Sequence, residues 1–562
     1  MPTETPTETA TKTLKKLETN FNEAANGNGV GIVNFKKNYR GRLEQFPEFN
    51  QSVVRDTDPK DLNYIVATNP MFGGENFRLK TTTAEQGKII LEKGKDAQKV
   101  FGKMDLDNRL DFLNILKEKI GKYSEDIKLT ITADMGKPVK ITEGEITKGN
   151  AWFDYIAKKA EDKLEPTITV GDKTIQSRHS REGLGVVQVI GAFNYPYALT
   201  IPGIVSGLVA GNSVVASTPE KAPNWIFPFM QAAHEAVEEF TNKHKLNEND
   251  ATALKEGLIQ YSIGRDPTLS NLADLVHFVG SDKTGNKIKE ERAGKPTILE
   301  MGGSNVVTVM NSAITDNEKA TKIATEIWGG FAPATGQRCT APRILCVQKG
   351  KAEGVADALK AICGQGPAIG NGGIGNPFSQ GTKIGPLADA NALEKMQAAV
   401  IEAKELGATI HGELKSHTEG LPAGGNWVNP IVIDWSTMKE TPEKIQSMHN
   451  IIKREEIFAP LIHIIHPVRD LQQAINITNY LDDTHKLAGA IYTANDEDHR
   501  LYKKKTHITS LARNSAPKDV SPDLRHGHPD MYGIGDENHF VPYSKPRIAV
   551  AKEKETFVGA GL

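Results

Sequence analysis

The 562-residue chain is predicted to be an α/β protein with parallel sheets and more than one domain. Its length exceeds the roughly 250 to 300 residues at which a single hydrophobic core stops growing, so two large domains are expected. After residue 185, short β-branched runs alternate with helical patterns. This alternation indicates right-handed strand, helix, strand units, which build parallel sheets.

Periodicity and turn residues place the individual elements. Apolar residues recur at helical spacing from 105 to 120, and Gly136 and Pro138 interrupt a helical pattern that then resumes to about residue 163. Short β-branched runs follow at 167–170 and 185–190, and the second is apolar enough to be a buried strand. The alternation continues with a helix at 203–210, a strand at 213–217 and a helix at 225–240.

The composition excludes several classes of partner. The 68 basic and 70 acidic residues leave a net charge of −2, so no basic field exists to hold nucleic acid. No uncharged apolar run of about 18 residues occurs, so we expect no membrane partner. Residues 1 to about 12 repeat Thr, Glu and Pro, which is unlike a signal or transit peptide and is expected to be disordered. These features predict a cytoplasmic protein.

Cysteine and histidine usage gives no sign of a disulfide framework or a metal centre. The chain contains only Cys339, Cys346 and Cys363, without the C-x-x-C spacing of a zinc ribbon, which fits a reducing compartment. Three C-terminal histidines match no closed zinc pattern and are interpreted as part of a polar surface loop: His526, His528 and His539. We therefore expect no metal.

Two short segments suggest a covalent active site. Cys339 lies in Gly-Gln-Arg-Cys-Thr at 336–340, and Glu300 lies in Leu-Glu-Met-Gly-Gly at 299–303. A thiolate attacks carbonyl carbon well, and a carboxylate can remove a proton from a thiol or from water. A lone Cys is more often a small buried hydrophobe and a lone Glu is more often solvated. The glycines flanking both residues permit close backbone approach, which favours a crowded site.

Two turns between a strand and a helix are suited to binding an anion. The first follows the strand that ends at Ile190, and the second is the segment His277 to Ser281, followed by Gly285. Backbone N–H groups at a helix start can hold a dinucleotide pyrophosphate or an oxyanion. Neither turn has the G-x-G-x-x-G pattern, and α/β proteins use glycine at many turns that bind nothing.

Four motifs in chain order resemble the NAD(P)-dependent aldehyde dehydrogenase superfamily, as in a divergent member, from about residue 85 to the C-terminus. They are Gly-Ala-Phe-Asn-Tyr-Pro at 191–196 with the later Gly-Asn-Ser-Val-Val at 211–215, Leu-Glu-Met-Gly-Gly at 299–303, Gly-Gln-Arg-Cys-Thr at 336–340, and Glu-Glu-Ile-Phe-Ala-Pro at 455–460. The resemblance implies a Rossmann-type parallel-sheet cofactor domain, an α/β catalytic domain and a small β oligomerisation extension.

The resemblance also implies domain boundaries. We expect a partly disordered N-terminal extension over 1–50, a cofactor-binding domain over 51–164 and 183–302, a catalytic domain over 303–515, and oligomerisation strands within 165–182 and 540–562. Exposed edge strands favour pairing with another subunit, so a homodimer or homotetramer is predicted.

The reaction implied by the resemblance is the oxidation of an aldehyde to its carboxylic acid. Cys339 would attack the aldehyde, Asn194 and the Cys339 backbone N–H would hold the oxyanion, and hydride would pass to nicotinamide. Glu300 would activate the water that splits the resulting thioester. Glu456 would bind the nicotinamide ribose, Phe458 would pack beside the ring, and Glu220 would bind the adenosine ribose. The full set of expected cofactor-binding residues is Ala192, Phe193, Glu220, Gly280, Ser281, Gly285, Glu456 and Phe458.

The chain departs from the family pattern near the cofactor. Gly203 and Ser217 stand where the family usually has lysines that contact the ribose or phosphate region. A carboxylate at Glu220 would repel a 2′-phosphate and favours NAD, whereas Lys221 keeps NADP possible. The loop at 516–533 departs more widely, so substrate choice is expected to have shifted there.

Several alternatives remain open at this stage. A CoA-acylating semialdehyde dehydrogenase would use the same thiol, although Glu300 argues against it, and the missing lysines suit a non-catalytic binding protein of the same fold. Arg338 either attracts an acidic semialdehyde or pairs structurally. Tyr195, Tyr197 and Trp328 either line an aromatic tunnel or belong to the core.

Overall fold

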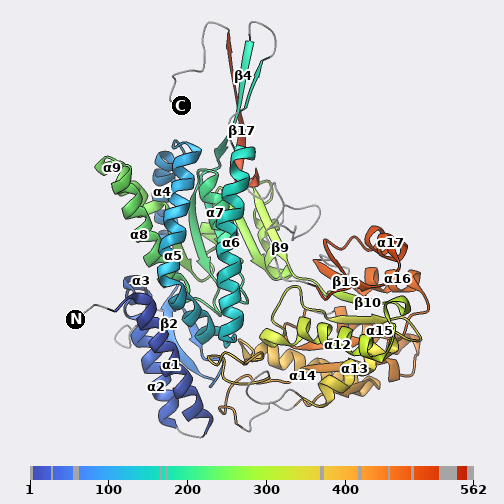
Figure 1. Cartoon of the computed structure of the whole chain (residues 1–562). Helices are drawn as coiled ribbons and strands as arrows, with labels where there is room; N and C mark the ends of the chain where they lie inside the picture. The colour runs from blue at the N-terminus through green and yellow to red at the C-terminus, as the bar shows by residue number, and fades with distance from the viewer. Residues whose placement is uncertain are drawn as a thin grey trace.

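The protein was analysed as a computed structural model, shown in Figure 1. It describes residues 4–26, 29–54, 63–164, 167–170, 175–366, 373–414, 420–453, 456–481, 487–517 and 541–552. The three histidines at 526, 528 and 539 and most of the divergent loop at 516–533 lie outside these ranges. No helix within the described ranges is long and apolar enough to cross a membrane.

The first of two large sheets is five-stranded and fully parallel, in the order β7-β6-β5-β8-β9. Val186 faces helix α4 (Ala84–Phe101), while Val187 faces α7 (Ile201–Val209) on the opposite side, so β5 is covered on both faces and can be apolar throughout. The strands are β5 (Val186–Ile190), β6 (Ser213–Thr218), β7 (Ile259–Ile263), β8 (Leu275–Gly280) and β9 (Thr297–Met301). The α/β class with parallel sheets is confirmed.

Helices surround this sheet and confirm the expected alternation. The helices predicted at 203–210 and 225–240 are α7 (Ile201–Val209) and α8 (Ile226–Lys243). The helix predicted from 105 is α5, which continues to Met135 and ends at Gly136 with a left-handed φ of 69°. The bounds of α5 are Leu106–Met135, and the remaining helices are α4 (Ala84–Phe101), α6 (Val139–Leu164), α9 (Glu248–Gly257), α10 (Pro267–Leu272) and α11 (Asp282–Glu291).

The second sheet has seven strands in the order β12-β13-β14-β11-β10-β15-β16, and only the edge strand β12 is antiparallel. Its strands are β10 (Val306–Val309), β11 (Ile344–Val347), β12 (Thr409–His411), β13 (Ile431–Asp434), β14 (Leu461–Ile464), β15 (Ala488–Tyr492) and β16 (Ser510–Arg513). Its helices are α12 (Asn317–Phe331), α13 (Glu353–Gly364), α14 (Ala390–Leu406), α15 (Pro442–Lys453), α16 (Leu471–Leu481) and α17 (Asp496–Thr506).

A third, three-stranded antiparallel sheet projects from the body of the molecule in Figure 1. It consists of β3 (Thr167–Val170), β4 (Ile175–Gly183) and β17 (Ser544–Lys552), which are the strands expected to mediate oligomerisation. At its base, Asn212 Nδ2 donates a hydrogen bond of 2.9 Å to the Tyr543 carbonyl and ties this sheet to the first one. Pairing with another subunit stays a prediction.

The N-terminal segment is helical, so the predicted disorder is wrong from Pro6 onward. Thr5 and Glu8 form a capping box, and the helix then buries Leu17 and Phe21. Repeated Thr and Glu are typical of disordered segments, but here they start a helix whose apolar face packs on α5. The segment contains α1 (Pro6–Ala25), α2 (Gly29–Leu43) and α3 (Pro47–Ser52), followed by the hairpin of β1 (Tyr64–Thr68) and β2 (Glu75–Lys80).

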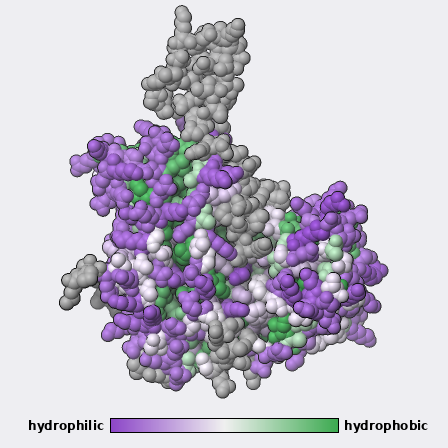
Figure 2. Space-filling model, viewed as in Figure 1, coloured by the Kyte–Doolittle hydropathy of each residue, from purple (hydrophilic) through white to green (hydrophobic). Residues whose placement is uncertain are grey.

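The surface is mostly hydrophilic on the face seen in Figure 2, with hydrophobic residues in small groups between helices. Large exposed hydrophobic side chains are scattered over separate elements, as Val33 on α2, Ile89 on α4 and Ile401 on α14 illustrate. Singly exposed apolar residues are normal on protein surfaces.

One buried ion pair fixes the N-terminal helices to α5. Arg42 Nε and one of its terminal nitrogens donate to the two oxygens of Asp126 at 2.5 and 2.6 Å. The side chains are only 5% and 1% exposed. Removing one member of such a pair leaves an uncompensated buried charge.

Arg42→Met is therefore expected to lower the thermal unfolding midpoint, with a cost of about 3 to 5 kcal/mol near neutral pH. Burial raises the pKa of Asp126, and Arg42 opposes that rise. Without Arg42 the folded protein holds the Asp126 proton more tightly than the unfolded chain, so stability falls as pH rises through the raised folded-state pKa. The loss should be larger at pH 8 than at pH 5 in scanning calorimetry.

Arg40→Met provides the matched control, because Arg40 pairs with Glu44 on the surface, where the side chains are 46% and 47% exposed. Exposed pairs contribute about 0 to 1 kcal/mol. Equal losses in the two variants would contradict the assigned role of the Arg42 pair.

Candidate active site

The segment that joins the two large sheets begins just after Glu300 and forms hydrogen bonds with the backbone at Cys339. Glu300 lies at the end of β9 and is 2% exposed. A few residues later, Asn305 Nδ2 donates to the Cys339 carbonyl at 2.7 Å and to the Ala341 carbonyl at 2.9 Å. Asn305 thus holds the backbone of the cysteine segment against the chain that leaves Glu300.

Cys339 follows a turn with unusual backbone geometry. Ala334, Thr335 and Gly336 have φ values of 53°, 57° and 68°, in the left-handed region that a β-branched residue rarely adopts. The Lys383 carbonyl accepts a hydrogen bond from Ala334 N at 3.0 Å, and the Gly385 carbonyl accepts one from Thr335 Oγ1 at 2.8 Å. Neighbouring backbone therefore holds the turn in place.

Gly336 is required in this turn for space as well as for torsion. A Cβ at this position would lie 2.3 Å from the Ala459 carbonyl oxygen. The cysteine turn therefore packs directly against the segment 456–459, which contains the predicted cofactor residues Glu456 and Phe458.

Arg343 links the same two segments, and sequence reasoning missed it. Its terminal nitrogens donate to the carbonyls of Ala459 at 2.7 Å, Gly336 at 2.7 Å and Arg338 at 3.3 Å. The guanidinium also lies 3.9 Å from Glu456 and 5.5 Å from the centre of the Phe458 ring. The available signal was a charged residue directly before the apolar run 344–347.

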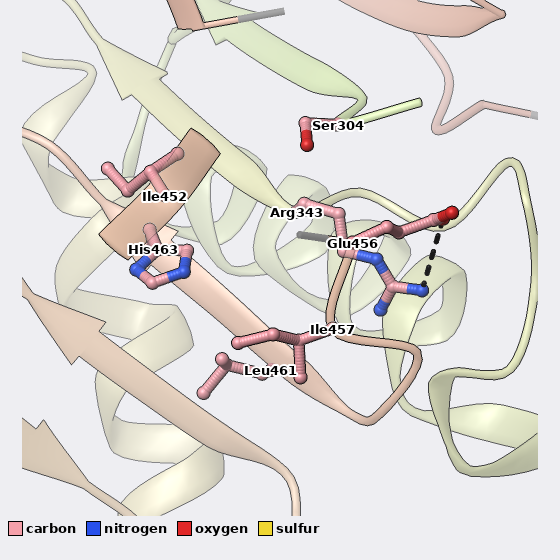
Figure 3. Close-up of a pocket in the computed structure, with 7 residues that line it drawn as sticks. All are labelled: Ser304, Arg343, Ile452, Glu456, Ile457, Leu461 and His463. Carbon is pink, nitrogen blue, oxygen red and sulfur yellow. Dashed lines mark ion pairs between the residues drawn. The ribbon is translucent and has the colours of Figure 1, made fainter. Parts of the chain in front are cut away.

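The electrostatics around Arg343 are those of a buried cation between acidic groups. Burial lowers the pKa of Arg343, and the negative charges of Glu456 and Cys339 oppose this. Figure 3 shows the Arg343 and Glu456 pair among the residues that line a small cavity. The cavity has a volume of about 20 Å³, enough for one water molecule. The cavity is lined by Ser304, Arg343, Ile452, Glu456, Ile457, Leu461 and His463.

A buried lysine, Lys137, binds the backbone carbonyl of Asn194. Lys137 Nζ donates to the Asn194 carbonyl at 2.8 Å and forms an ion pair with Glu145, with both side chains fully buried. Glu145 in turn accepts from the backbone nitrogens of Tyr197 and Ala198 at 2.9 and 3.2 Å. The loop after β5 is thus fixed at Asn194, which is 2% exposed, and at the residues that follow it.

The predicted aromatic residues divide between the core and the site's surroundings. Tyr197 is fully buried and donates to Asn150 Oδ1 at 2.5 Å, so it belongs to the core. The Tyr195 ring lies under the Lys137 ammonium at 4.2 Å, and the Trp328 ring lies 5.9 Å from Lys383 Nζ. These contacts favour a structural interpretation of Tyr197 over the tunnel interpretation.

The predicted cofactor residues gather at one edge of the first sheet. Ala192 and Phe193 follow β5, Glu220 follows β6, and Gly280 ends β8. Because these strands are parallel, their carboxyl ends meet at the same edge, which is where α/β proteins bind dinucleotides. Ser281 caps the N-terminus of α11, and Gly285 lets that helix approach β9, since a Cβ there would lie 2.3 Å from Met301 Sδ.

The segment 456–459, which leads into the second sheet, lies against this edge of the first sheet. The rings of Phe193 and Phe458 lie 5.8 Å apart at 61°, and a Cβ at Gly302 would lie 2.2 Å from Glu456 Oε2. Phe193 and Phe458 therefore lie in contact, and Glu456 lies next to the end of β9. These aromatic and carboxylate side chains are of types that suit a nicotinamide dinucleotide.

At Gly203 and Ser217, where the family usually has lysines, neighbouring side chains occupy the surrounding space. A Cβ at Gly203 would lie 2.6 Å from His277 Nδ1 and 2.7 Å from Val189 Cγ1, so no larger side chain fits. Ser217 Oγ contacts Ser262 Oγ at 2.6 Å and accepts from Gln188 Nε2 at 2.8 Å. Neither position supplies a side chain to the cofactor.

The charges near Glu220 differ from the sequence expectation. Lys221 forms an ion pair with Asp389, and its ammonium lies 4.6 Å from the centre of the Phe193 ring. The charge of Lys221 is therefore already paired. The cation beside Glu220 is Arg265, at 3.5 Å. Sequence reasoning missed Arg265, although a charged residue two positions after the run 259–263, beyond Gly264, was a usable signal.

The other cysteines differ from Cys339 in exposure. Cys346 and Cys363 are buried, and burial raises the pKa of each to about 12, whereas Cys339 is partly exposed. Within the described ranges, no cluster of three or more His, Cys, Asp or Glu residues is arranged to hold a metal.

The comparisons with known proteins agree with this geometry. The alpha-ketoglutaric semialdehyde dehydrogenase of Bacillus subtilis is 27% identical over 455 residues, which cover 79% of this chain and 82% of that protein. The NADP-dependent glyceraldehyde-3-phosphate dehydrogenase of Arabidopsis thaliana is 25% identical, with coverage of 81% and 84%.

Solved structures show the same fold. The NADP complex of glyceraldehyde-3-phosphate dehydrogenase from Bacillus halodurans matches with a TM-score of 0.73 at 23% identity, covering 89% of this chain and 99% of that one. The NAD-dependent aldehyde dehydrogenase from Sinorhizobium meliloti matches with a TM-score of 0.72 at 20% identity, covering 88% and 92%. The sequence pattern of the Aldehyde dehydrogenase family matches residues 57–538. Because that match covers most of the chain, the protein belongs to the aldehyde dehydrogenase family of NAD(P)-dependent oxidoreductases.

Proposed function

We propose that the protein oxidises an aldehyde to its carboxylic acid through a covalent intermediate on Cys339. The observation that carries this proposal is the placement of Cys339. It is partly exposed, while Cys346 and Cys363 are buried, and its turn is held against the cofactor-facing segment 456–459 by Arg343. A positive charge close to a thiol favours the thiolate, which is the nucleophilic form.

In the first step the Cys339 thiolate attacks the carbonyl carbon, and the carbonyl oxygen becomes an oxyanion. The Asn194 side chain and the Cys339 backbone N–H would donate to that oxygen, and preorganised donors of this kind lower the barrier by about 3 to 4 kcal/mol. Lys137 and Asn305 keep the two donors in position through the carbonyls of Asn194 and Cys339.

Phe193, Phe458 and Glu456 would hold a nicotinamide dinucleotide, which would supply the hydride acceptor when bound. Loss of hydride from the tetrahedral adduct leaves a thioester on Cys339. Glu300 would then remove a proton from a water molecule, which attacks the thioester carbon and breaks the C–S bond. The carboxylic acid leaves, and the thiolate is regenerated.

Cofactor choice would depend on Glu220. A carboxylate at this edge would accept a hydrogen bond from a ribose hydroxyl and repel a 2′-phosphate, so NAD is the proposed preference. Arg265 keeps NADP accessible, because its guanidinium pairs with Glu220 in the absence of an anion and is largely exposed.

The CoA-acylating alternative differs only in the group that accepts the acyl chain. Glu300 favours water as that group, and comparing products with and without CoA distinguishes the two. The names of both relatives above include an aldehyde that carries an acidic group. An acidic aldehyde, attracted by Arg338 next to the thiol, is therefore the first substrate class to test.

Assembly and location are proposed with the activity. The strands β3, β4 and β17 form a projecting sheet with two edges, which would pair with a second subunit in a homodimer or homotetramer. Three free cysteines fit a reducing, cytoplasmic setting.

Cys339→Ala is expected to abolish aldehyde-dependent reduction of NAD(P), because no thiolate remains to form the covalent adduct. Residual activity should be at least ~10³-fold below wild type, as for other removed nucleophiles. Absorbance of the reduced dinucleotide, with aliphatic, aromatic and acidic aldehydes, provides the measurement. Cys363→Ala, a buried thiol on α13, is the control and should remain active. Comparable activity in Cys339→Ala and wild type would refute the covalent route.

Glu220→Gln is expected to raise the ratio of kcat/KM for NADP to that for NAD by about tenfold. The substitution removes the charge that repels a 2′-phosphate and releases Arg265 to bind it. Arg265→Gln should move the ratio in the opposite direction. Steady-state kinetics with both cofactors test this, and an unchanged ratio in both variants would place the discriminating groups elsewhere.

A further inference from the structure

The two N-terminal helices α1 and α2 form a hairpin that precedes the segment matched to the family. The match begins at residue 57, whereas the hairpin spans residues 6–43. The helices touch closely at Gly31, where a Cβ would lie 2.6 Å from Ala24 N. Aromatic residues on its inner side, Phe21 and Phe35, are buried. The hairpin is therefore a packed structural unit that lies outside the segment matched to the family.

One side of this hairpin is fixed to helix α5. Besides the Arg42 and Asp126 pair, Tyr39 OH donates to Asp134 Oδ1 at 2.5 Å, and Thr7 Oγ1 donates to the Lys122 carbonyl at 3.1 Å. The contacts are distributed along α5, so the hairpin cannot easily rotate relative to the first sheet and its helices.

The other side of the hairpin contacts residues 373–385, which we call the support loop. Asn376 Nδ2 donates to the Glu18 carbonyl at 3.0 Å and to Asn22 Oδ1 at 3.1 Å. Ser379 Oγ donates to Glu18 Oε1 at 2.6 Å. The rings of Phe35 and Phe378 pack 5.6 Å apart. One residue, Glu18, thus binds the support loop with both its backbone and its side chain.

The support loop also fixes the backbone turn 334–336, which precedes Cys339. The carbonyls of Lys383 and Gly385 accept the hydrogen bonds from Ala334 and Thr335 that stabilise the left-handed backbone. A displacement of the support loop would therefore be transmitted directly to this turn.

The support loop also touches the segment that fixes Asn194. The Pro377 carbonyl accepts a hydrogen bond from Val139 N at 2.7 Å, and a Cβ at Gly385 would lie 1.9 Å from the Gly136 carbonyl oxygen. Between these two contacts lies Lys137, whose ammonium donates to the Asn194 carbonyl. Both proposed catalytic groups are therefore connected to one loop.

We propose that the N-terminal hairpin positions Cys339 and Asn194 by holding the support loop, with Glu18 as the central positioning residue. This inference rests on the proposed role of Cys339. A misplacement of about 1 Å can cost up to ~10²-fold in rate, so a small shift of the loop would be visible in kinetics.

The test compares Glu18→Ala with Glu18→Gln. Glutamine keeps an oxygen that accepts from Ser379, whereas alanine removes it. Glu18→Ala is expected to lower both kcat and the rate of Cys339 alkylation by iodoacetamide by about three- to tenfold. KM for the dinucleotide should change less than about twofold. Glu18→Gln should restore both rates, and Lys16→Ala, an exposed position on the same helix, should match wild type.

Equal alkylation rates and kcat in Glu18→Ala and wild type would overturn the proposal, even if the thermal midpoint falls. Deleting residues 1–28 is the stronger variant, and the point substitutions decide the question if that protein does not fold. Alkylation needs no substrate, so it reports on the turn independently of the reaction. Activity that survives Cys339→Ala would instead refute the proposed function, while Cys339-dependent activity that is indifferent to Glu18 refutes only this inference.

Discussion

The position of Cys339 depends on a turn whose backbone is unfavourable in isolation. Ala334, Thr335 and Gly336 are all left-handed, and each such non-glycine residue costs about 1 to 3 kcal/mol. Contacts on two sides offset this cost. The support loop accepts hydrogen bonds on one side, and Arg343 binds the Gly336 carbonyl on the other. The support loop also contacts the segment that holds Asn194, and Arg343 also binds the segment 456–459. The geometry of the whole site therefore depends on this turn.

The departures from the family pattern form a consistent set. At Gly203 the missing side chain leaves space that His277 occupies, and at Ser217 a buried hydrogen-bonded group with Gln188 and Ser262 replaces a lysine. Buried polar groups are stable only when they are paired, and here the Gln188 amide nitrogen and the two serine hydroxyls are paired with one another. This local repacking supports the proposal of a catalytic protein with altered cofactor contacts over that of a fold that has lost its function.

Sequence patterns predicted the helix ends and strands that are determined by residues close together in the chain. Gly136 ended α5 as expected, and the apolar runs at 186–190 and 213–218 formed central strands because both faces are covered. Arg343 and Lys137 could not be found in this way, since their partners are carbonyls far away in the chain, such as Ala459 and Asn194. The helix that begins at Pro6 was missed for the same reason, because its apolar face is stabilised by α5 rather than by its own composition.

Trapping the acyl-enzyme tests the central claim most directly. Glu300→Gln would keep the shape of the site but could not activate water, so the thioester should accumulate after one turnover. Intact-mass and peptide-mass analysis after acid quench, with aldehyde and dinucleotide present, should find the acyl mass on the peptide that contains Cys339. Full turnover without any adduct, or an adduct on Cys346 or Cys363, would contradict covalent catalysis by Cys339.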